Sequence, residues 1–366
     1  MIGRIAPSAA GIILALIWFL GAAGTASGHP EGPSGQSLTV TDLAGREVAV
    51  PREINNIACL DVLCYQKLFM LGQSAKAVVM YFTDAPWMAI TNPDMAKIPK
   101  IEGNPSLEEL LLSKVDVAFF AYDTRRMSGK LASIGIPGVV SQPQGLRADT
   151  LEGFLDQTKR SVMVYGQVLG GEALERAKDW CDYLDERVRY VSSRTARIPE
   201  NQRPKVYYLR GPTALHTQGR NGDTFWYGEL AGADMLAKNY RLAAMGPVSM
   251  EQIIEWNPDV ILVGRQYPLD MVLKDPRWRT ISAVKSAKVY PLPSGVFYWD
   301  GGLEEVLLMQ YLAKTLHPDL FADLDLVAEV RSFYSRFYRY PLSEDQARKL
   351  LAGLSPDGSR FKLYNN

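Results

Sequence analysis

The chain has 366 residues, of which 47% are hydrophobic, and its 40 basic and 40 acidic side chains leave no formal net charge. It is long enough to bury one large core or two ordinary ones, and its balanced charge argues against a nucleic-acid-binding protein. The three cysteines lack the spacing of metal ligands and there are only three histidines, which argues against a zinc site, a cysteine-ligated cluster and a histidine-rich catalytic centre.

Residues 1–28 have the pattern of a secretory signal peptide. Arg4 gives a positive start, residues 11–23 are apolar, and residues 24–28 offer small side chains for cleavage. The apolar run is short for a membrane span, which takes about 20 residues, and no cysteine directly follows it for lipid attachment. We therefore expect a periplasmic protein, exported and soluble after cleavage.

Export to an oxidising compartment bears on the three cysteines. Cys59 and Cys64 are close enough in the sequence to form a disulfide, which would leave Cys181 over. Buried free thiols are an equally good interpretation, and the sequence leaves both arrangements open.

Residues 38–149 alternate strand and helix patterns, which is typical of a mostly parallel sheet with helices on both faces. A hairpin at 38–51 comes first, with alternating strands around Ala44-Gly45. The patterns then predict strands at 54–60, 77–81 and 136–140, a helix at 62–71, and a helix–turn–strand unit at 106–120. This stretch should form an N-terminal lobe.

Residues 150–198 have helical periodicity with one break, at Gly170-Gly171. Apolar residues recur on one face, and nothing in the stretch is typical of a flexible linker. We expect it to cross between two lobes as a stiff connecting helix.

Residues 203–366 should form a C-terminal lobe of the same class. The patterns predict strands at 205–209 and 288–292, helices at 223–231, 276–283, 302–316, 321–338 and 343–351, and a second helix–turn–strand unit at 248–263. The predicted fold class is therefore α/β, with two doubly wound α/β lobes joined by a long backbone helix.

The two helix–turn–strand units correspond to each other. Each has a serine suited to cap the helix, a glutamate in the first helical turn, and an apolar strand after the turn. Glu108 precedes Asp116 by the same interval that separates Glu251 from Asp259. The match indicates two lobes of similar build.

In order and spacing, the chain resembles the periplasmic substrate-binding proteins of iron-complex and cobalamin ABC importers, in which one rigid helix joins two α/β lobes. The resemblance covers essentially all of the chain after the signal peptide. It is carried by the hairpin Thr41 to Pro51, the unit Leu107 to Phe120, the helix from Thr150, residues 219–233 (GRNGDTFWYGELAGA), and Val248 to Val263. The chain departs from the pattern at Val115-Asp116, where the family usually has Pro-Asp.

The resemblance implies a monomeric binding protein, not an enzyme, whose lobes close only modestly around a ligand. Such proteins hand the ligand to an ABC permease dimer in the membrane, and one glutamate on each lobe docks against basic residues of the permease. The matching positions here are Glu108 and Glu251. Each carboxylate also interacts favourably with its own helix dipole, which would explain it without a partner.

The ligand of a two-lobe α/β protein is expected between the lobes, outside the carboxyl ends of the strands. The loops there are rich in arginines, which pair with anionic oxygens, and in aromatic residues, which stack on flat organic groups. The candidate ligand-binding residues are Tyr81, Trp87, Arg125, Arg126, Arg210, His216, Arg220, Trp226, Tyr227, Arg265, Tyr298 and Trp299. They favour an iron(III) chelate, a ferric siderophore, over a bare cation, which needs a cage of carboxylates or histidines.

Other ligands and one other class of protein remain open. The same fold could bind haem, cobalamin, a nickel complex or molybdate, and His216 with Tyr298 could ligate a metal directly. An exported metal-cofactor enzyme is the further alternative. The sequence has no Gly-x-Ser-x-Gly elbow, no His-Glu-x-x-His, no phosphate loop and no dinucleotide fingerprint, so we expect no intrinsic cofactor and no catalysis.

Overall fold

The computed structural model describes residues 37–81, 85–101, 105–121, 125–142, 148–220, 222–240, 245–265 and 267–360. The predicted signal peptide lies outside these ranges. Within them, no helix combines the length and the apolar character that a membrane crossing requires.

The first sheet is parallel, with the strand order β5-β4-β3-β6-β7. Its central strands β3 and β6 are buried at every position, as in a sheet covered on both faces. An antiparallel hairpin, β1 and β2, precedes it. The elements are β1 Ser37–Thr41, β2 Glu47–Pro51, β3 Ile57–Leu60, α1 Cys64–Met70, β4 Ala77–Tyr81, α2 Met88–Thr91, β5 Lys100–Ile101, α3 Leu107–Leu112, β6 Val117–Phe120, α4 Arg125–Ser133 and β7 Gly138–Val140. We call this part the first lobe.

The second sheet has the order β11-β9-β8-β12-β13, with β10 also paired to β8. Strands β8, β10, β12 and β13 are parallel, whereas β9 and β11 run antiparallel to their neighbours. The elements are β8 Lys205–Leu209, β9 His216–Thr217, α7 Asp223–Leu230, β10 Asp234–Met235, β11 Gly246–Pro247, α8 Met250–Trp256, β12 Val260–Val263, α9 Asp270–Leu273, α10 Ser282–Lys285 and β13 Val289–Pro291. This part is the second lobe. The predicted α/β class with two lobes is confirmed.

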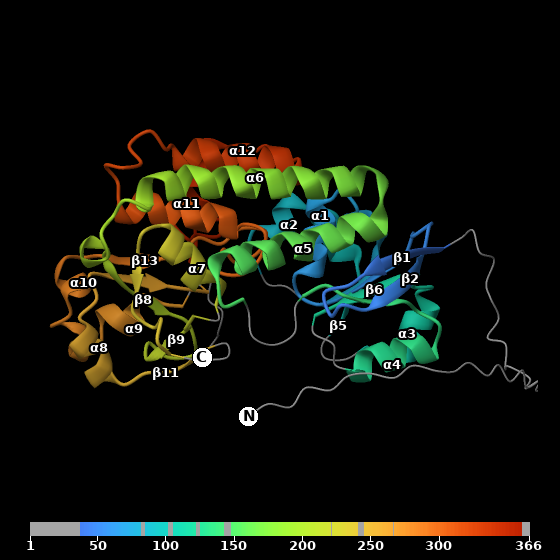
Figure 1. The fold of residues 1–366 in the computed structure, drawn as a ribbon, viewed down its shortest axis with the longest axis horizontal. Helices are drawn as coiled ribbons and strands as arrows, with labels where there is room; N and C mark the ends of the chain where they lie inside the picture. The colour runs from blue at the N-terminus through green and yellow to red at the C-terminus, as the bar shows by residue number, and fades with distance from the viewer. Residues whose placement is uncertain are drawn as a thin grey trace, which may run out of the picture. The chain divides into compact units, whose positions relative to one another are not determined.

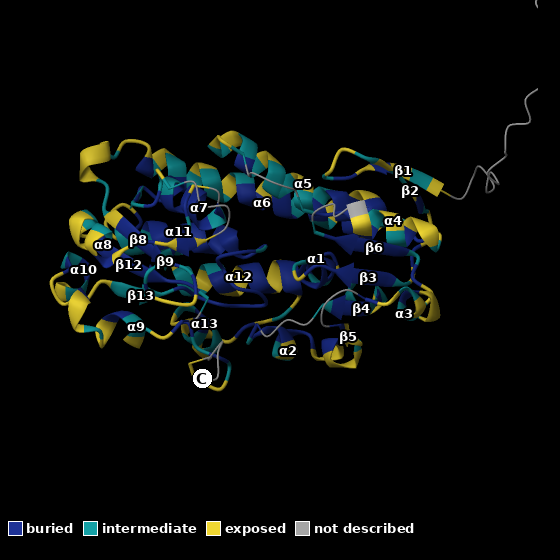
Figure 2. Ribbon diagram, turned by 90° about the horizontal axis from the view of Figure 1, so that it is seen from below, coloured by how far each residue is buried: buried dark blue, intermediate teal, exposed yellow. Residues whose placement is uncertain are grey.

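Long helices connect and cover the two lobes: α5 Leu151–Leu169, α6 Gly171–Thr195, α11 Glu305–Leu316, α12 Leu326–Tyr338 and α13 Glu344–Leu351. Helices α5 and α6 lie side by side (Figure 1). Helix α11 is largely buried, and α12 buries one face (Figure 2). Since α1 of the first lobe packs on α12, where the rings of Phe69 and Tyr338 stack 5.1 Å apart, both lobes share one helical layer.

The predicted connecting helix is two antiparallel helices. The chain reverses at Gly170 and Gly171, which both have a positive φ that side chains rarely adopt. The reversal brings Lys159 on α5 within 3.0 Å of Asp185 on α6. The sequence break was therefore placed correctly, but it is a reversal rather than an interruption of one crossing helix. The exact lobe limits, 38–149 and 203–366, stay predictions.

The two helix–turn–strand units have the same local geometry. The hydroxyl oxygens of Ser106 and Ser249 accept hydrogen bonds from the backbone N–H three residues on, at 3.0 and 3.1 Å. At matched positions after the helices, Lys114 and Asn257 have φ of 49° and 43°. The correspondence predicted from the glutamate spacing is therefore structural.

Several predicted boundaries were wrong for local reasons. The loop expected around Arg125 and Arg126 is helix α4. Helix α12 begins at Leu326 and not near 321, because the Asp325 carboxylate caps it by accepting from Val327 and Ala328 N–H groups. The helix expected at 276–283 is a short 3-10 turn at Pro276–Trp278 followed by α10.

Cys59 and Cys64 form a disulfide, with 5.3 Å between their Cα atoms, that joins the end of β3 to the start of α1. Cys181 is a buried free thiol, and burial raises its pKa to about 12. The structure thus selects the disulfide from the two arrangements that the sequence left open.

Candidate functional site

A cluster of charged side chains lies at the carboxyl ends of β8 and β12. The carboxylate of Asp300 has Arg265 Nε at 2.7 Å and Arg210 Nε at 3.1 Å, and it accepts a hydrogen bond of 2.6 Å from the hydroxyl of Tyr208. Burial acts to raise the pKa of Asp300, but the two guanidinium groups outweigh it and hold the pKa below its usual value. The carboxylate therefore stays charged and fixes both arginines at the end of the sheet.

The cluster lies next to the contact between the lobes. The guanidinium carbon of Arg265 is 4.6 Å from the ring centre of Tyr298 and 5.4 Å from that of Phe297. Phe297 and Tyr298 form one buried hydrophobic cluster with Ala85 of the first lobe. The backbone N–H of Trp87 donates to the carbonyl of Gly295 at 3.3 Å. The loop that carries Tyr298 and Asp300 is thus held between the arginines and the other lobe.

A buried polar network ties this loop to α1 and α12. The Glu304 carboxylate accepts hydrogen bonds from the N–H groups of Val296 and Phe297 and from the hydroxyl of Tyr334. Gln66 of the first lobe donates to the same carboxylate at 3.3 Å and accepts from the backbone of the second lobe at Leu303. Burial raises the pKa of Glu304 to about 7, although its hydrogen bonds act to lower it.

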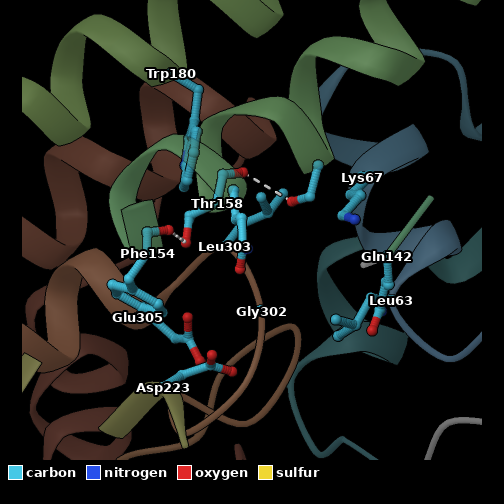
Figure 3. Close-up of a pocket in the computed structure, with 12 residues that line it drawn as sticks. Leu63, Lys67, Gln142, Phe154, Thr158, Trp180, Asp223, Gly302, Leu303 and Glu305 are labelled. Atoms are coloured by element: carbon cyan, nitrogen blue, oxygen red, sulfur yellow. Dashed lines mark hydrogen bonds between the residues drawn. The ribbon is translucent and has the colours of Figure 1, made fainter. Parts of the chain in front are cut away.

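Behind the contact lies a cavity of about 70 Å³ (Figure 3). Lys67 and Gln142 of the first lobe line one side, and Asp223 of the second lobe and Glu305 of α11 line the other (Figure 3). Lys67 is buried, and its Nζ donates to the Ser141 carbonyl at 3.4 Å. Burial lowers the pKa of Lys67 to about 8, against the opposing effect of Asp61 and Glu305. With one basic and two acidic side chains, the cavity is unfavourable for a multiply charged anion.

Most of the predicted aromatic residues are buried. Trp87, Trp226, Tyr227, Tyr298 and Trp299 are each at most 6% exposed. Trp226 and Tyr227 pack on Phe154 of α5, with ring centres 6.1 and 5.2 Å apart. Their roles in ligand binding stay predictions, and in this structure they act as packing residues.

The other predicted residues occupy separate places. His216 is half-buried on β9, and its Nδ1 is 2.7 Å from the hydroxyl of Thr213. Arg220 is exposed, donates to the carbonyl of Asp149 at 3.0 Å and lies over the Trp226 ring. Tyr81 ends β4, while Arg125 and the exposed Arg126 begin α4. Within the described ranges, no group of three or more His, Cys, Asp and Glu is arranged to hold a metal ion, and direct metal ligation by His216 and Tyr298 stays a prediction.

The predicted docking glutamates, Glu108 on α3 and Glu251 on α8, are both exposed in the first turns of their helices. Backbone and Ser249 hydrogen bonds lower the pKa of Glu251. Their sequence correspondence therefore places one exposed carboxylate on each lobe.

Sequence reasoning missed the buried charged residues that organise the site. Asp300, Glu304 and Lys67 were not candidates, although Asp300 directly follows the predicted aromatic pair Tyr298-Trp299. An acidic residue in an arginine-rich set of loops was the available signal, since buried guanidinium groups need a counter-charge.

Comparison with known proteins identifies the class. A family model described as "periplasmic binding protein" matches residues 57–296. The molybdate-binding protein MolA of Haemophilus influenzae is 27% identical over 337 residues, 85% of this chain and 93% of that protein. Its molybdate-bound structure aligns with a TM-score of 0.73 at 24% identity, covering 84% of this chain and 99% of that one.

A periplasmic solute-binding protein from Veillonella parvula aligns with a TM-score of 0.74 at 26% identity, covering 87% of this chain and 97% of that one. An ABC transporter solute-binding protein from Sulfurospirillum deleyianum aligns with a TM-score of 0.71 at 22% identity, over 85% and 98% of the two chains. The family model spans more than half of the sequence and the folds agree over almost the whole length of each relative. The chain therefore belongs to the periplasmic binding protein family.

Proposed function

We propose that the chain captures an anionic ligand beside Arg210 and Arg265 and delivers it to the permease of an ABC importer. The observation that carries this proposal is the meeting of both guanidinium groups around Asp300 at the edge of the sheet. Two guanidinium groups offer ten N–H donors, more than one carboxylate can accept. The cluster also has a formal charge of +1, and the arginine side chains are 14% and 21% exposed. An anion can therefore bind to the donors that Asp300 leaves.

A small oxyanion such as molybdate is the first ligand to test. The molybdate-binding relative is similar over most of both chains, and an oxyanion needs several N–H donors and little apolar wall. The burial of the predicted aromatic residues favours this choice, because buried rings are not available to stack on a large organic ligand.

A ferric siderophore, the ligand expected from the sequence, is the second candidate. The observation that favours it is Tyr81, the predicted aromatic residue that is not buried, which ends β4 and offers an aromatic surface at the carboxyl end of the first sheet. The exposed Arg126 of the first lobe would add an anion-binding contact to a ligand of that size. Under either proposal the chain binds and transfers its ligand without catalysing a reaction.

The test is isothermal titration of the purified protein with molybdate, tungstate, sulfate, a panel of ferric siderophores, haem and cobalamin. Arg210→Ala and Arg265→Ala should each weaken the binding of an anionic ligand roughly 10- to 100-fold, because a charged hydrogen bond contributes about 1.5–3 kcal/mol. Arg277→Ala is the matched control, since Arg277 pairs with Asp275 at the exposed surface of the same lobe. Tight binding of haem or cobalamin that both variants retain would reject the anionic ligand.

Delivery requires docking, for which Glu108 and Glu251 are the proposed contacts. An exposed carboxylate on each lobe suits a permease dimer that presents a basic residue on each half. Glu108→Ala and Glu251→Ala should reduce ligand uptake by cells while leaving ligand affinity in solution unchanged.

A further inference from the structure

The faces of α3 and α8 are copies of one surface element. The correspondence extends to the strands beside them. The carboxylate of Asp116 accepts from the backbone N–H groups of Asn55 and Asn56, both at 2.8 Å, just before β3. The carboxylate of Asp259 accepts from the N–H of Lys205 at 2.9 Å, at the start of β8. Both helices are therefore fixed in the same way to the central strand of their sheet.

An exposed apolar side chain accompanies each glutamate. Leu111 lies three residues after Glu108, and Ile254 lies three residues after Glu251, so each pair is on one helical face. Leu111 is 52% exposed and Ile254 is 49% exposed. Exposed large hydrophobic side chains are few among the described residues, and two of them occupy these matched positions. Each lobe thus repeats a carboxylate and an apolar contact in one arrangement.

We propose that Leu111 and Ile254 are the second contact at each docking point, and that they insert into apolar surface beside the basic residues of the permease. This inference rests on the docking proposed above and adds an apolar contact beside each docking glutamate. The glutamates would select the basic partner and the orientation, while the burial of the two aliphatic side chains supplies affinity.

The charges around the two faces favour a basic membrane protein over other occupants. Each helix carries two glutamates, Glu108 and Glu109 on α3 and Glu251 and Glu255 on α8, and Arg277 offsets only part of the negative charge near Glu251. Anionic lipid headgroups would be repelled by them, and so would the same face of a second copy of this chain. A partner with a basic residue and apolar surface on each half fits both faces at once.

The neighbouring position distinguishes the two faces. Leu112, which is 77% exposed, occupies the position that Glu255 has in the second unit. The first face is therefore the more apolar of the two. Loss of the apolar contact should accordingly weaken docking more through α3 than through α8.

The test is photocrosslinking of the full chain in the cells that produce it. The photoreactive amino acid p-benzoylphenylalanine replaces Glu108, Leu111, Glu251 or Ile254 one at a time, and Leu273 or Leu320 in controls that are 48% and 44% exposed but unmatched. The proposal predicts that one membrane protein, identified by mass spectrometry, crosslinks from all four docking positions and from neither control.

The outcomes separate this inference from the docking on which it rests. Crosslinks from 108 and 251 without crosslinks from 111 and 254 would overturn the apolar contact and leave the docking proposal standing. No membrane protein from any of the four positions, or only crosslinks between copies of the chain, would overturn both.

A second measurement gives the size of the effect. Leu111→Ser and Ile254→Ser should each weaken binding of the protein to vesicles of those cells' inner membrane roughly five- to tenfold, as expected for a half-exposed aliphatic side chain that becomes buried. Leu273→Ser should leave this binding unchanged. Equal binding by Leu111→Ser, Ile254→Ser and the control would contradict the inference.

Discussion

Replacing Asp300 with asparagine would remove the charge that holds the two site arginines together. The side chain is 1% exposed, forms ion pairs with Arg210 and Arg265, and accepts a hydrogen bond from Tyr208. Removal of one partner of a buried ion pair costs about 3–5 kcal/mol, because the remaining charges lose their compensation. The arginines are 14% and 21% exposed, so solvent screens part of their repulsion. We therefore expect a loss near the lower end, about 3 kcal/mol.

The assay is urea unfolding followed by tryptophan fluorescence at pH 7, with thermal unfolding in parallel. A loss of about 3 kcal/mol corresponds to a Tm lower by roughly 4 °C, because residues 37–366 form one compact unit with a large unfolding entropy. The folded pKa of Asp300 is depressed, so its contribution is present above the unfolded pKa of about 4 and is lost as the pH falls through the folded value. The difference between wild type and Asp300→Asn should therefore shrink in acid.

The matched control is Asp179→Asn. Asp179 also binds an arginine, Arg336, through two hydrogen bonds, but both side chains are more than 40% exposed. An exposed pair contributes about 0–1 kcal/mol. Equal losses of unfolding free energy in the two variants would refute the view that burial makes the Asp300 cluster important for stability. A bound anion should also raise the Tm of Asp300→Asn more than that of wild type, since it restores the missing negative charge.

Other predictions concern the buried groups around the lobe contact. Glu304→Gln should flatten the dependence of the free energy of unfolding on pH. The folded pKa of Glu304 is raised from 4.5 to about 7, so the wild type loses on the order of 3 kcal/mol of stability as the pH rises between these values. If urea unfolding from pH 5 to 8 gives the same pH dependence for variant and wild type, the prediction is wrong. Lys67→Met should stabilise the protein by about 2–3 kcal/mol at pH 7, because burial lowers the folded pKa of Lys67 to about 8 and so makes its charge unfavourable. The wild type regains this stability as the pH rises from about 8 to about 10.5, so the advantage of the variant should disappear above that range. A variant that is less stable than wild type at pH 7 would contradict this. Reduction of the Cys59–Cys64 disulfide should lower the free energy of unfolding by about 2 kcal/mol, the chain-entropy value for a short loop, whereas Cys181→Ser should not change the response to dithiothreitol.

Secondary-structure elements could be predicted from the sequence better than the tertiary contacts between them. The repeated unit, the strand β12 and the break at Gly170-Gly171 were all visible, because periodicity and capping are local signals. That the break reverses the chain was not visible, since a glycine pair can equally interrupt a crossing helix. Helix α4 was missed because few apolar residues mark its buried face.

The candidate site shows the same division. Arg210 and Arg265 were expected from their places after strands, but their convergence on Asp300 depends on three segments that only the tertiary fold brings together. Trp226 was expected to face a ligand because of its position near a loop; its ring packs on Phe154 of α5, and its role in ligand binding stays a prediction. The position of a residue after a strand indicates that its side chain lies near the ligand site, whereas the burial of that side chain decides whether a ligand can contact it.

The shared helical layer has a consequence for the kinetics of capture. Arg176 of α6 donates to the carbonyl of Met70 in the first lobe and to that of Phe337 in α12, so a wide separation of the lobes would have to break these bonds or bend the helices. A ligand should therefore bind in a single diffusional step, without a slow closing phase after encounter. The importer would then distinguish loaded from empty protein by differences of small amplitude, and empty protein would compete with loaded protein for the same docking position.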